Sequence, residues 1–235
     1  KVDGDFTLHE WRDAAALTGF VDLVGGALAD LQTTVLLTYD AERLYVAFYS
    51  LLPPKYELHA RADTRDGQVW DDDSIEFVFD PTAARTVDRS YHFIGNAHGV
   101  FFDDKNRDVK WNVNWAFKSQ LQENWRGIGL RCWALEISIP FADLERKPPV
   151  NGERWTANFG HTWFRERSLF SSWACPPIAQ YNACQHFGTL EFREQAPVLQ
   201  WTDFRDLGGG QRVMEGSWQG AQAGRITARV AGQKE

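Results

Sequence analysis

A tryptophan and three aspartates come directly before a strand-like stretch, in "QVWDDDSIEFVFD" at residues 68–80. Trp70 opens the group, and Glu76 falls on the polar side of the alternating pattern that follows. These residue types could serve three chemistries: a pair of catalytic carboxylates, a metal-binding loop, or an aromatic surface for a sugar ring. The rest of the chain has to discriminate among them.

Catalysis by paired carboxylates is one interpretation. A glycoside hydrolase needs two carboxyl groups on either side of the scissile bond. Glu76 and Glu136 both interrupt apolar strand patterns on the polar face, so they are the candidate pair, although each also fits a solvated residue on a sheet face. Nucleophilic and metalloprotease chemistry have no support, since the sequence holds neither G-x-S-x-G nor H-x-x-x-H.

Two acidic segments predict a structural calcium site. Hard cations prefer oxygen ligands in loops, and the segments "DDD" and "DDKNRD" supply them densely. The candidate ligands are Asp71, Asp72, Asp73, Asp103, Asp104 and Asp108. The alternative is that these aspartates cap turns and strand ends.

Composition excludes several classes of partner. The net charge of −7 disfavours nucleic acid and anionic membrane surfaces, because both are bound through Lys and Arg. No apolar run approaches the roughly 18 residues that a membrane span requires, so we expect no membrane insertion. Eleven tryptophans exceed what one core needs, and some are therefore predicted to serve recognition.

The cysteines and the first residues bear on the cellular compartment. Cys175 and Cys184 lie nine residues apart and could form a disulfide in an exported protein, or stay unpaired thiols. Together with Cys132 they show no Cys-x-x-Cys zinc spacing. The sequence begins "KVDGDF" without a signal peptide, so we expect a mature or excised domain.

Period-2 alternation through most of the chain predicts strands. "TTVLLTYD" with "RLYVAFYS", and "RSYHFIGN" with "GVFFDD", read as two hairpins. Only 8–15 and 140–145 look helical, and both are short. The expected fold is an all-β, antiparallel, jelly-roll-like β-sandwich with short helical turns, formed by residues 1–194 as one domain.

The composition changes after residue 194. Residues 195–235 are rich in glycine and contain few large apolar residues, although "GRITARVAG" still alternates like a strand. We interpret this segment as an appended C-terminal hairpin or tail that packs on the sandwich.

Six motifs in order resemble the family 9 carbohydrate-binding modules and are similar to the broader DOMON-like sandwich superfamily. They are "VDGDFTLHEW", "YDAERLYVAFYS", "QVWDDDSIEFVFD", "RCWALEISIPFADL", "GERWTANFGHTW" and "SSWACPPIAQYNACQHFGTLEF". The resemblance covers residues 1–194. It implies a calcium-containing β-sandwich that binds sugars, at the reducing ends of plant polysaccharides in characterised members, and that is not catalytic.

Transferred position by position, the resemblance implies five carbohydrate-binding residues: Trp70, Glu76, His92, Asn158 and Tyr181. Trp70 and Tyr181 match the two rings of an aromatic clamp, and Glu76 matches a glutamate that accepts sugar hydroxyls. His92 stands where an arginine is usual.

Two positions depart from the family pattern. Gly160 stands where a glutamine is expected, and Ile178 where the loop asparagine is expected. Two polar contacts to sugar hydroxyls are therefore missing, so we expect a looser or altered sugar preference compared with the reducing-end mode of the family.

The expected function is a non-catalytic carbohydrate-binding module for plant-type polysaccharide or oligosaccharide. The alternatives are a structural or interaction domain of the same ancestry within a larger secreted protein, and a glycoside hydrolase that uses Glu76 and Glu136. The expected partners are a carbohydrate and a catalytic domain in the same polypeptide. The expected location is extracellular, at the cell surface or periplasmic.

Overall fold

The computed structural model describes residues 1–164, 169–174, 180–194, 198–208 and 211–219. The chain divides into two units, Lys1–Glu194 and Gln195–Glu235. The boundary lies where the composition of the sequence changes.

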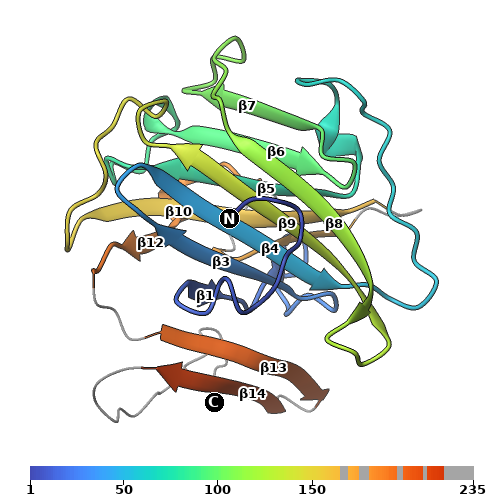
Figure 1. Ribbon diagram of the computed structural model, residues 1–235. Coiled ribbons are helices and arrows are strands. Elements are labelled where there is room, and N and C mark those ends of the chain that lie inside the picture. Colours follow the sequence, from blue (N-terminus) through green and yellow to red (C-terminus); the bar gives the residue numbers. More distant parts are fainter. Residues whose placement is uncertain (165–168, 175–179, 195–197, 209–210, 220–235) are drawn as a thin grey trace. The chain divides into compact units, whose positions relative to one another are not determined.

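The first unit is built from two antiparallel sheets (Figure 1). Within the described residues, the first sheet has five strands in the order β1-β3-β4-β9-β8. Their bounds are Ala15–Leu17 for β1, Thr33–Tyr39 for β3, Arg43–Leu51 for β4, Leu130–Pro140 for β9 and Ala116–Trp125 for β8.

The second sheet has the order β2-β11-β10-β5-β6-β7, and a further strand, β12, pairs with the start of β10. Its strands are Val21–Asp22 for β2, Leu169–Ser172 for β11, Arg154–Trp163 for β10, Ser74–Asp80 for β5, Tyr91–Asn96 for β6, Phe101–Lys105 for β7 and Gly188–Glu191 for β12. The predicted antiparallel β-sandwich is confirmed.

Both predicted hairpins are present. Strands β3 and β4 pair from Thr33↔Ser50 to Tyr39↔Leu44, and β6 pairs with β7 from Tyr91 to Gly95. Short polar turns join each pair, as the sequence predicts.

Alternating side chains of both sheets form the core between the layers. Ile75, Phe77 and Phe79 of β5 are fully buried, together with Trp133 of β9 and Trp155 of β10. Because alternate residues of a strand face opposite sides, the residues between them lie on the outer face of their sheet. Those outer residues of β5 form the centre of the candidate site.

The two helical predictions are wrong. Residues 8–13 and 141–145 form turns, and the described residues contain only short 3-10 helices: η1 (Val69–Asp71), η2 (Val87–Arg89) and η3 (Cys184–His186). A helix this short has too few hydrogen bonds to offset its nucleation cost. The N-terminal turn instead buries Phe6 and Trp11 against the outer face of the first sheet.

The second unit contains a hairpin. Strand β13 (Val198–Gly208) pairs antiparallel with β14 (Gln211–Gln219). Packing of this hairpin on the sandwich stays a prediction, and the strand predicted from "GRITARVAG" lies outside the described residues. In the part of the chain that the structure covers, no helix has the length and apolar character of a membrane span.

Candidate functional site

Glu76 lies on the outer face of the second sheet, in a central strand. Its neighbours Ile75 and Phe77 belong to the core, so its carboxylate is directed away from the core. Across the sheet it pairs with Gly160 on β10 and Ile94 on β6. The middle of this outer face therefore carries one carboxylate flanked by a glycine and an aliphatic side chain.

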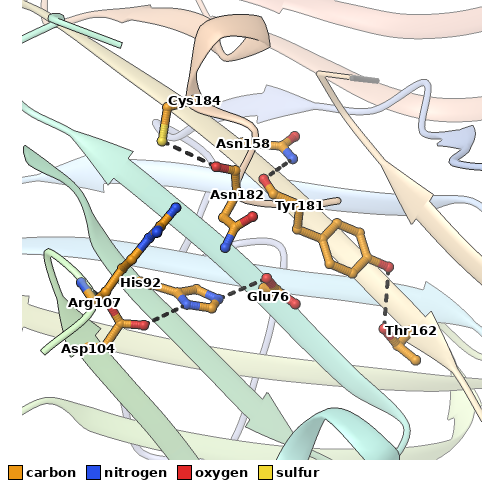
Figure 2. Close-up of polar contacts among 9 residues, drawn as sticks. All are labelled: Glu76, His92, Asp104, Arg107, Asn158, Thr162, Tyr181, Asn182 and Cys184. Carbon is orange, nitrogen blue, oxygen red and sulfur yellow. Dashed lines mark hydrogen bonds and ion pairs between the residues drawn. The ribbon is translucent and has the colours of Figure 1, made fainter. Parts of the chain in front are cut away.

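A three-membered network joins Glu76 to the next two strands. Nε2 of His92 lies 2.8 Å from Oε1 of Glu76, and Nδ1 lies 2.9 Å from Oδ2 of Asp104 (Figure 2). Burial lowers the pKa of His92, but the charge of Glu76 and the hydrogen bonds to both carboxylates outweigh it and raise the pKa to about 9.

His92 is therefore an imidazolium ion at neutral pH, and both of its ring nitrogens donate. One positive and two negative charges leave the network with a net charge of −1. Oε2 of Glu76 accepts no hydrogen bond from the described residues. That oxygen is held in place and is free to accept from a bound hydroxyl group.

Tyr181 lies directly over Gly160. A Cβ atom added at Gly160 would stand 2.4 Å from Cδ1 and Cε1 of the tyrosine ring. The phenol donates to the carbonyl oxygen of His161 at 2.9 Å and lies 3.3 Å from Oγ1 of Thr162. The ring of Tyr181 thus fills the space that the glutamine expected at position 160 would occupy.

Asn158 anchors the segment that carries Tyr181. Its Nδ2 donates to the carbonyl oxygen of Tyr181 at 2.8 Å, and its Oδ1 accepts from Ser172 Oγ and from the Ala174 N–H. The side chain is fully buried. Asn158 thus positions the aromatic residue, and direct contact with a sugar stays a prediction.

Trp70 lies over the same outer face, toward β7. Its side chain is 45% exposed, and its ring meets Phe102 edge-on at 5.8 Å between centroids. Phe102 pairs with Ile94, so three strand spacings of about 4.8 Å, roughly 14 Å, separate it from Gly160. Trp70 and Tyr181 therefore lie over the two sides of the Glu76–His92 network.

The aspartates before β5 act as acceptors for the backbone. Asp73 is buried and accepts from Tyr56 Oη and from the N–H groups of His59 and Phe164, each at 2.6 Å. Asp72 accepts from the N–H groups of Arg61 and Ala62 and from Asn96 Nδ2. Both fix the segment after β4 to the start of β5.

The second acidic segment is also occupied by protein partners. Asp103 accepts from Arg65 and from the Val113 N–H, Asp104 holds His92, and Asp108 caps the Lys110 N–H. Within the described residues, no three His, Cys, Asp or Glu side chains gather in a way that could hold a metal ion. The six predicted ligands therefore do not fit a calcium cage, and calcium itself stays an untested prediction.

The fold does not bring together Glu76 and Glu136, the pair considered for the alternative of a glycoside hydrolase. Glu136 belongs to β9 of the first sheet, where it is buried and accepts from Trp11 Nε1 at 3.1 Å and from the Gly4 N–H at 3.2 Å. Its neighbours Leu135 and Ile137 face the core. Glu136 and Glu76 thus lie on opposite outer faces of the sandwich, and no glycosidic bond can lie between them.

Two nearby residues are absent from the sequence predictions. Arg107 and Asn182 line one pocket beside the network. Asn182 follows Tyr181 directly in the sequence. Arg107 lies within the acidic segment "DDKNRD", whose aspartates point to a metal site and not to a cation that binds ligands. Cys175, one half of the possible Cys175–Cys184 disulfide, and the departure at Ile178 lie outside the described residues.

Comparison of the structure with solved structures identifies the fold. A family 9 carbohydrate-binding module from Caldicellulosiruptor kristjanssonii in complex with glucose has a TM-score of 0.60 and 16% identity, over 83% of this chain and 92% of that one. The chain has the fold of a family 9 carbohydrate-binding module. The same kind of module in complex with cellotriose gives a TM-score of 0.56 and 16% identity, over 83% and 90% of the two chains.

A third structure of this fold is a candidate carbohydrate-binding protein from Bacteroides uniformis. It has a TM-score of 0.60 and 16% identity, and the match covers 79% of this chain and 89% of that one. No profile of a protein family matches the sequence, and no curated protein matches it. The likeness to the family 9 fold thus rests on the structure, and neither of these two comparisons by sequence adds to it.

Proposed function

We propose that this chain is a non-catalytic carbohydrate-binding domain for plant-type polysaccharide or oligosaccharide. The observation that carries the proposal is Glu76, held by a protonated His92 on an outer sheet face between two aromatic side chains, Trp70 and Tyr181. The family 9 fold supports it, because solved modules with this fold include complexes with glucose and cellotriose.

The chemistry of a sugar ring matches this arrangement. A pyranose has an apolar face of C–H groups and a rim of hydroxyl groups. The exposed ring of Trp70 offers a surface for the apolar face. Oε2 of Glu76 accepts from a hydroxyl, and the contact of Oε1 with His92 fixes the carboxylate in one orientation.

The network argues against turnover of the sugar. A glycoside hydrolase needs space for the scissile bond between its two carboxyl groups. Glu76 and Asp104 are joined through the ring of His92, which occupies the space between them. Glu76 therefore binds a hydroxyl group and does not act in an acid–base pair.

We further propose that the domain acts outside the cytoplasm, extracellularly, at the cell surface or in the periplasm, and within a polypeptide that also carries a catalytic domain. A binding domain of this kind raises the effective concentration of an attached enzyme at its polymeric substrate. Appending the domain to a polysaccharide hydrolase should lower the enzyme concentration needed on insoluble substrate and leave turnover of soluble substrate unchanged.

The test of sugar binding is a panel of soluble oligosaccharides measured by calorimetry, together with affinity gels of insoluble polysaccharides. We expect a dissociation constant of about micromolar or weaker, since hydroxyl groups exchange water for protein at little net gain. Trp70→Ala should abolish detectable binding. The matched control is Ile128→Ala, which removes an exposed apolar side chain on the hairpin of the other sheet.

A different result would favour the alternative function. If no member of the panel binds, or if both variants bind as the parent chain does, the outer face is not a sugar site. The structural or interaction domain would then be the better interpretation. Release of product from a chromogenic glycoside would show instead that the domain is an enzyme.

A further inference from the structure

A polar pocket of about 300 Å³ opens beside the segment that carries Tyr181. Two arginines and three amides line most of it: Arg85, Arg107, Gln180, Asn182 and Gln185. Of the described residues that line the pocket, none is acidic. The site therefore has a positive character within a chain whose net charge is −7.

Arg107 is the available cation of this pocket. Its main-chain N–H donates to Oδ1 of Asp104 at 3.0 Å, which fixes the backbone next to the Glu76–His92–Asp104 network. The side chain is exposed, and its guanidinium group has no hydrogen-bond or ion-pair partner among the described residues. A guanidinium group without a carboxylate partner can bind one from a ligand.

Arg85 is held more rigidly at the other side. Its guanidinium group donates to the carbonyl oxygen of Phe187 and to Oγ1 of Thr189, and its main-chain N–H donates to Asp80. These contacts fix the guanidinium position and leave some of its five N–H donors unused. The pocket thus combines one fixed cation with one adaptable cation.

The pocket adjoins the proposed sugar site. Figure 2 shows the Arg107 side chain beside the His92–Asp104 pair, with the side chain of Asn182 directed toward the same network. Asn182 follows Tyr181 in the chain, and its carbonyl oxygen accepts from Cys184 Sγ at 3.3 Å. A ring bound at Glu76 and Tyr181 could therefore place a substituent or the next sugar residue in the pocket.

We propose that this pocket binds the carboxylate of a uronic acid residue, so that the domain prefers glycans that carry such residues. The inference rests on the proposed sugar-binding function. Guanidinium groups bind carboxylates through paired N–H donors, and neighbouring amides can serve the remaining hydroxyl groups. The overall negative charge repels a dense polyanion at long range, which favours a mainly neutral glycan with isolated carboxylates.

The experiment compares two ligands that differ in one group. They are an oligosaccharide of plant cell walls that carries glucuronic acid, and the same oligosaccharide with its carboxyl group reduced to the alcohol. We expect the acidic ligand to bind about fivefold to tenfold more tightly at low salt, between the value of an exposed ion pair and that of a charge-assisted hydrogen bond. Sodium chloride at about 0.5 M should reduce this preference.

Two charge-neutralising variants locate the effect. Arg107→Gln should bind the acidic ligand no more tightly than the reduced one. Arg89→Gln removes the same charge from an exposed residue of η2 that does not line the pocket, and it should keep the preference. Thermal unfolding of each variant verifies the fold.

Three results would overturn the inference. Equal affinity of the parent chain for both ligands would show that the pocket does not bind the carboxylate, while the proposed sugar binding would still stand. Equal loss of preference in Arg107→Gln and Arg89→Gln shows a general charge effect. Absence of binding by either ligand shows that the proposed sugar-binding function itself has failed.

Discussion

Substitution of Gly160 tests whether Tyr181 is positioned as the structure describes. In Gly160→Ala the new Cβ would stand 2.4 Å from two ring carbons of Tyr181, which is closer than any side chain tolerates. Gly160 lies within β10, whose backbone continues on both sides, so the tyrosine ring is the group that must move.

The expected cost follows from the contacts that Tyr181 loses. Displacement of the ring breaks the hydrogen bond from its phenol to the His161 carbonyl oxygen, at about 1 kcal/mol. Overpacking adds about 1 to 2 kcal/mol. We therefore expect Gly160→Ala to lower the free energy of unfolding by about 2 to 3 kcal/mol and to weaken sugar binding, because the ring leaves the outer face.

A double-mutant cycle makes this prediction specific. In a Tyr181→Ala background, the alanine at position 160 has room, so its cost should fall by at least about 1 kcal/mol. Denaturant unfolding measures all four variants. Gly25→Ala is the matched control, since a Cβ there meets only Asp22 Oδ1 at an ordinary 3.4 Å. An equal cost of Gly160→Ala in both backgrounds would refute the packing of Tyr181 on Gly160.

Three further predictions concern pH, the aspartate before β5, and metal. Because the pKa of His92 rises from 6.5 to about 9 on folding, its stabilisation is complete below about pH 6.5 and is lost as the pH rises to 9. The loss is at most about 3 kcal/mol, and a His92→Gln variant followed by denaturant unfolding from pH 6 to 9.5 should lack it. Asp73→Ala leaves three donors without their acceptor and should lower the free energy of unfolding by about 3 kcal/mol or more. The control Asp71→Ala changes an exposed neighbour and should lower it by less than about 0.5 kcal/mol. Equal losses of the two variants in urea unfolding would contradict this prediction. If calcium binds only to the folded chain, excess chelator should lower the Tm. An unchanged melting curve would contradict the prediction of a structural calcium site.

The alternation of apolar and polar residues determined the fold class. Each long strand of the sandwich lies where the sequence repeats with period 2, and a one-residue shift would expose the phenylalanines of β5. Turn residues between apolar runs likewise determined the two hairpins. Local patterns suffice here because the face of a strand residue depends only on its position in the repeat.

The helical predictions failed for a tertiary reason. Trp11 and Phe141 lie in segments with helix-like spacing, yet both are buried against sheets. The free energy of burying these rings exceeds the weak helical preference of a segment with fewer than two turns. The spacing of apolar residues along the chain carries no information about contacts with a distant strand.

Within the candidate site, the sequence supplied the residue types and the structure decided their partners. The sequence placed Glu76 on a polar face, but only strand pairing brought His92 beside it, from 16 residues further along, and Asp104 beside His92, from another 12 residues along. The sequence marked Glu136 in the same way as Glu76, although it lies in the other sheet under the N-terminal segment. Which sheet a strand joins depends on long-range hydrogen bonds between backbones, and no local pattern encodes them.

For the aspartates as well, the sequence supplied the residue types and the structure decided their partners. Their density in two segments is a property of the sequence and is compatible with metal ligands or with caps. The fold brings the main-chain N–H groups of distant residues such as Phe164 to Asp73, so this carboxylate accepts hydrogen bonds from the backbone, and calcium stays a prediction. The sequence by itself thus determined that this chain is a β-sandwich with a polar, aromatic outer face. Tertiary structure alone decided which charges on that face meet, because their separation in space is set by strand order and not by distance along the chain.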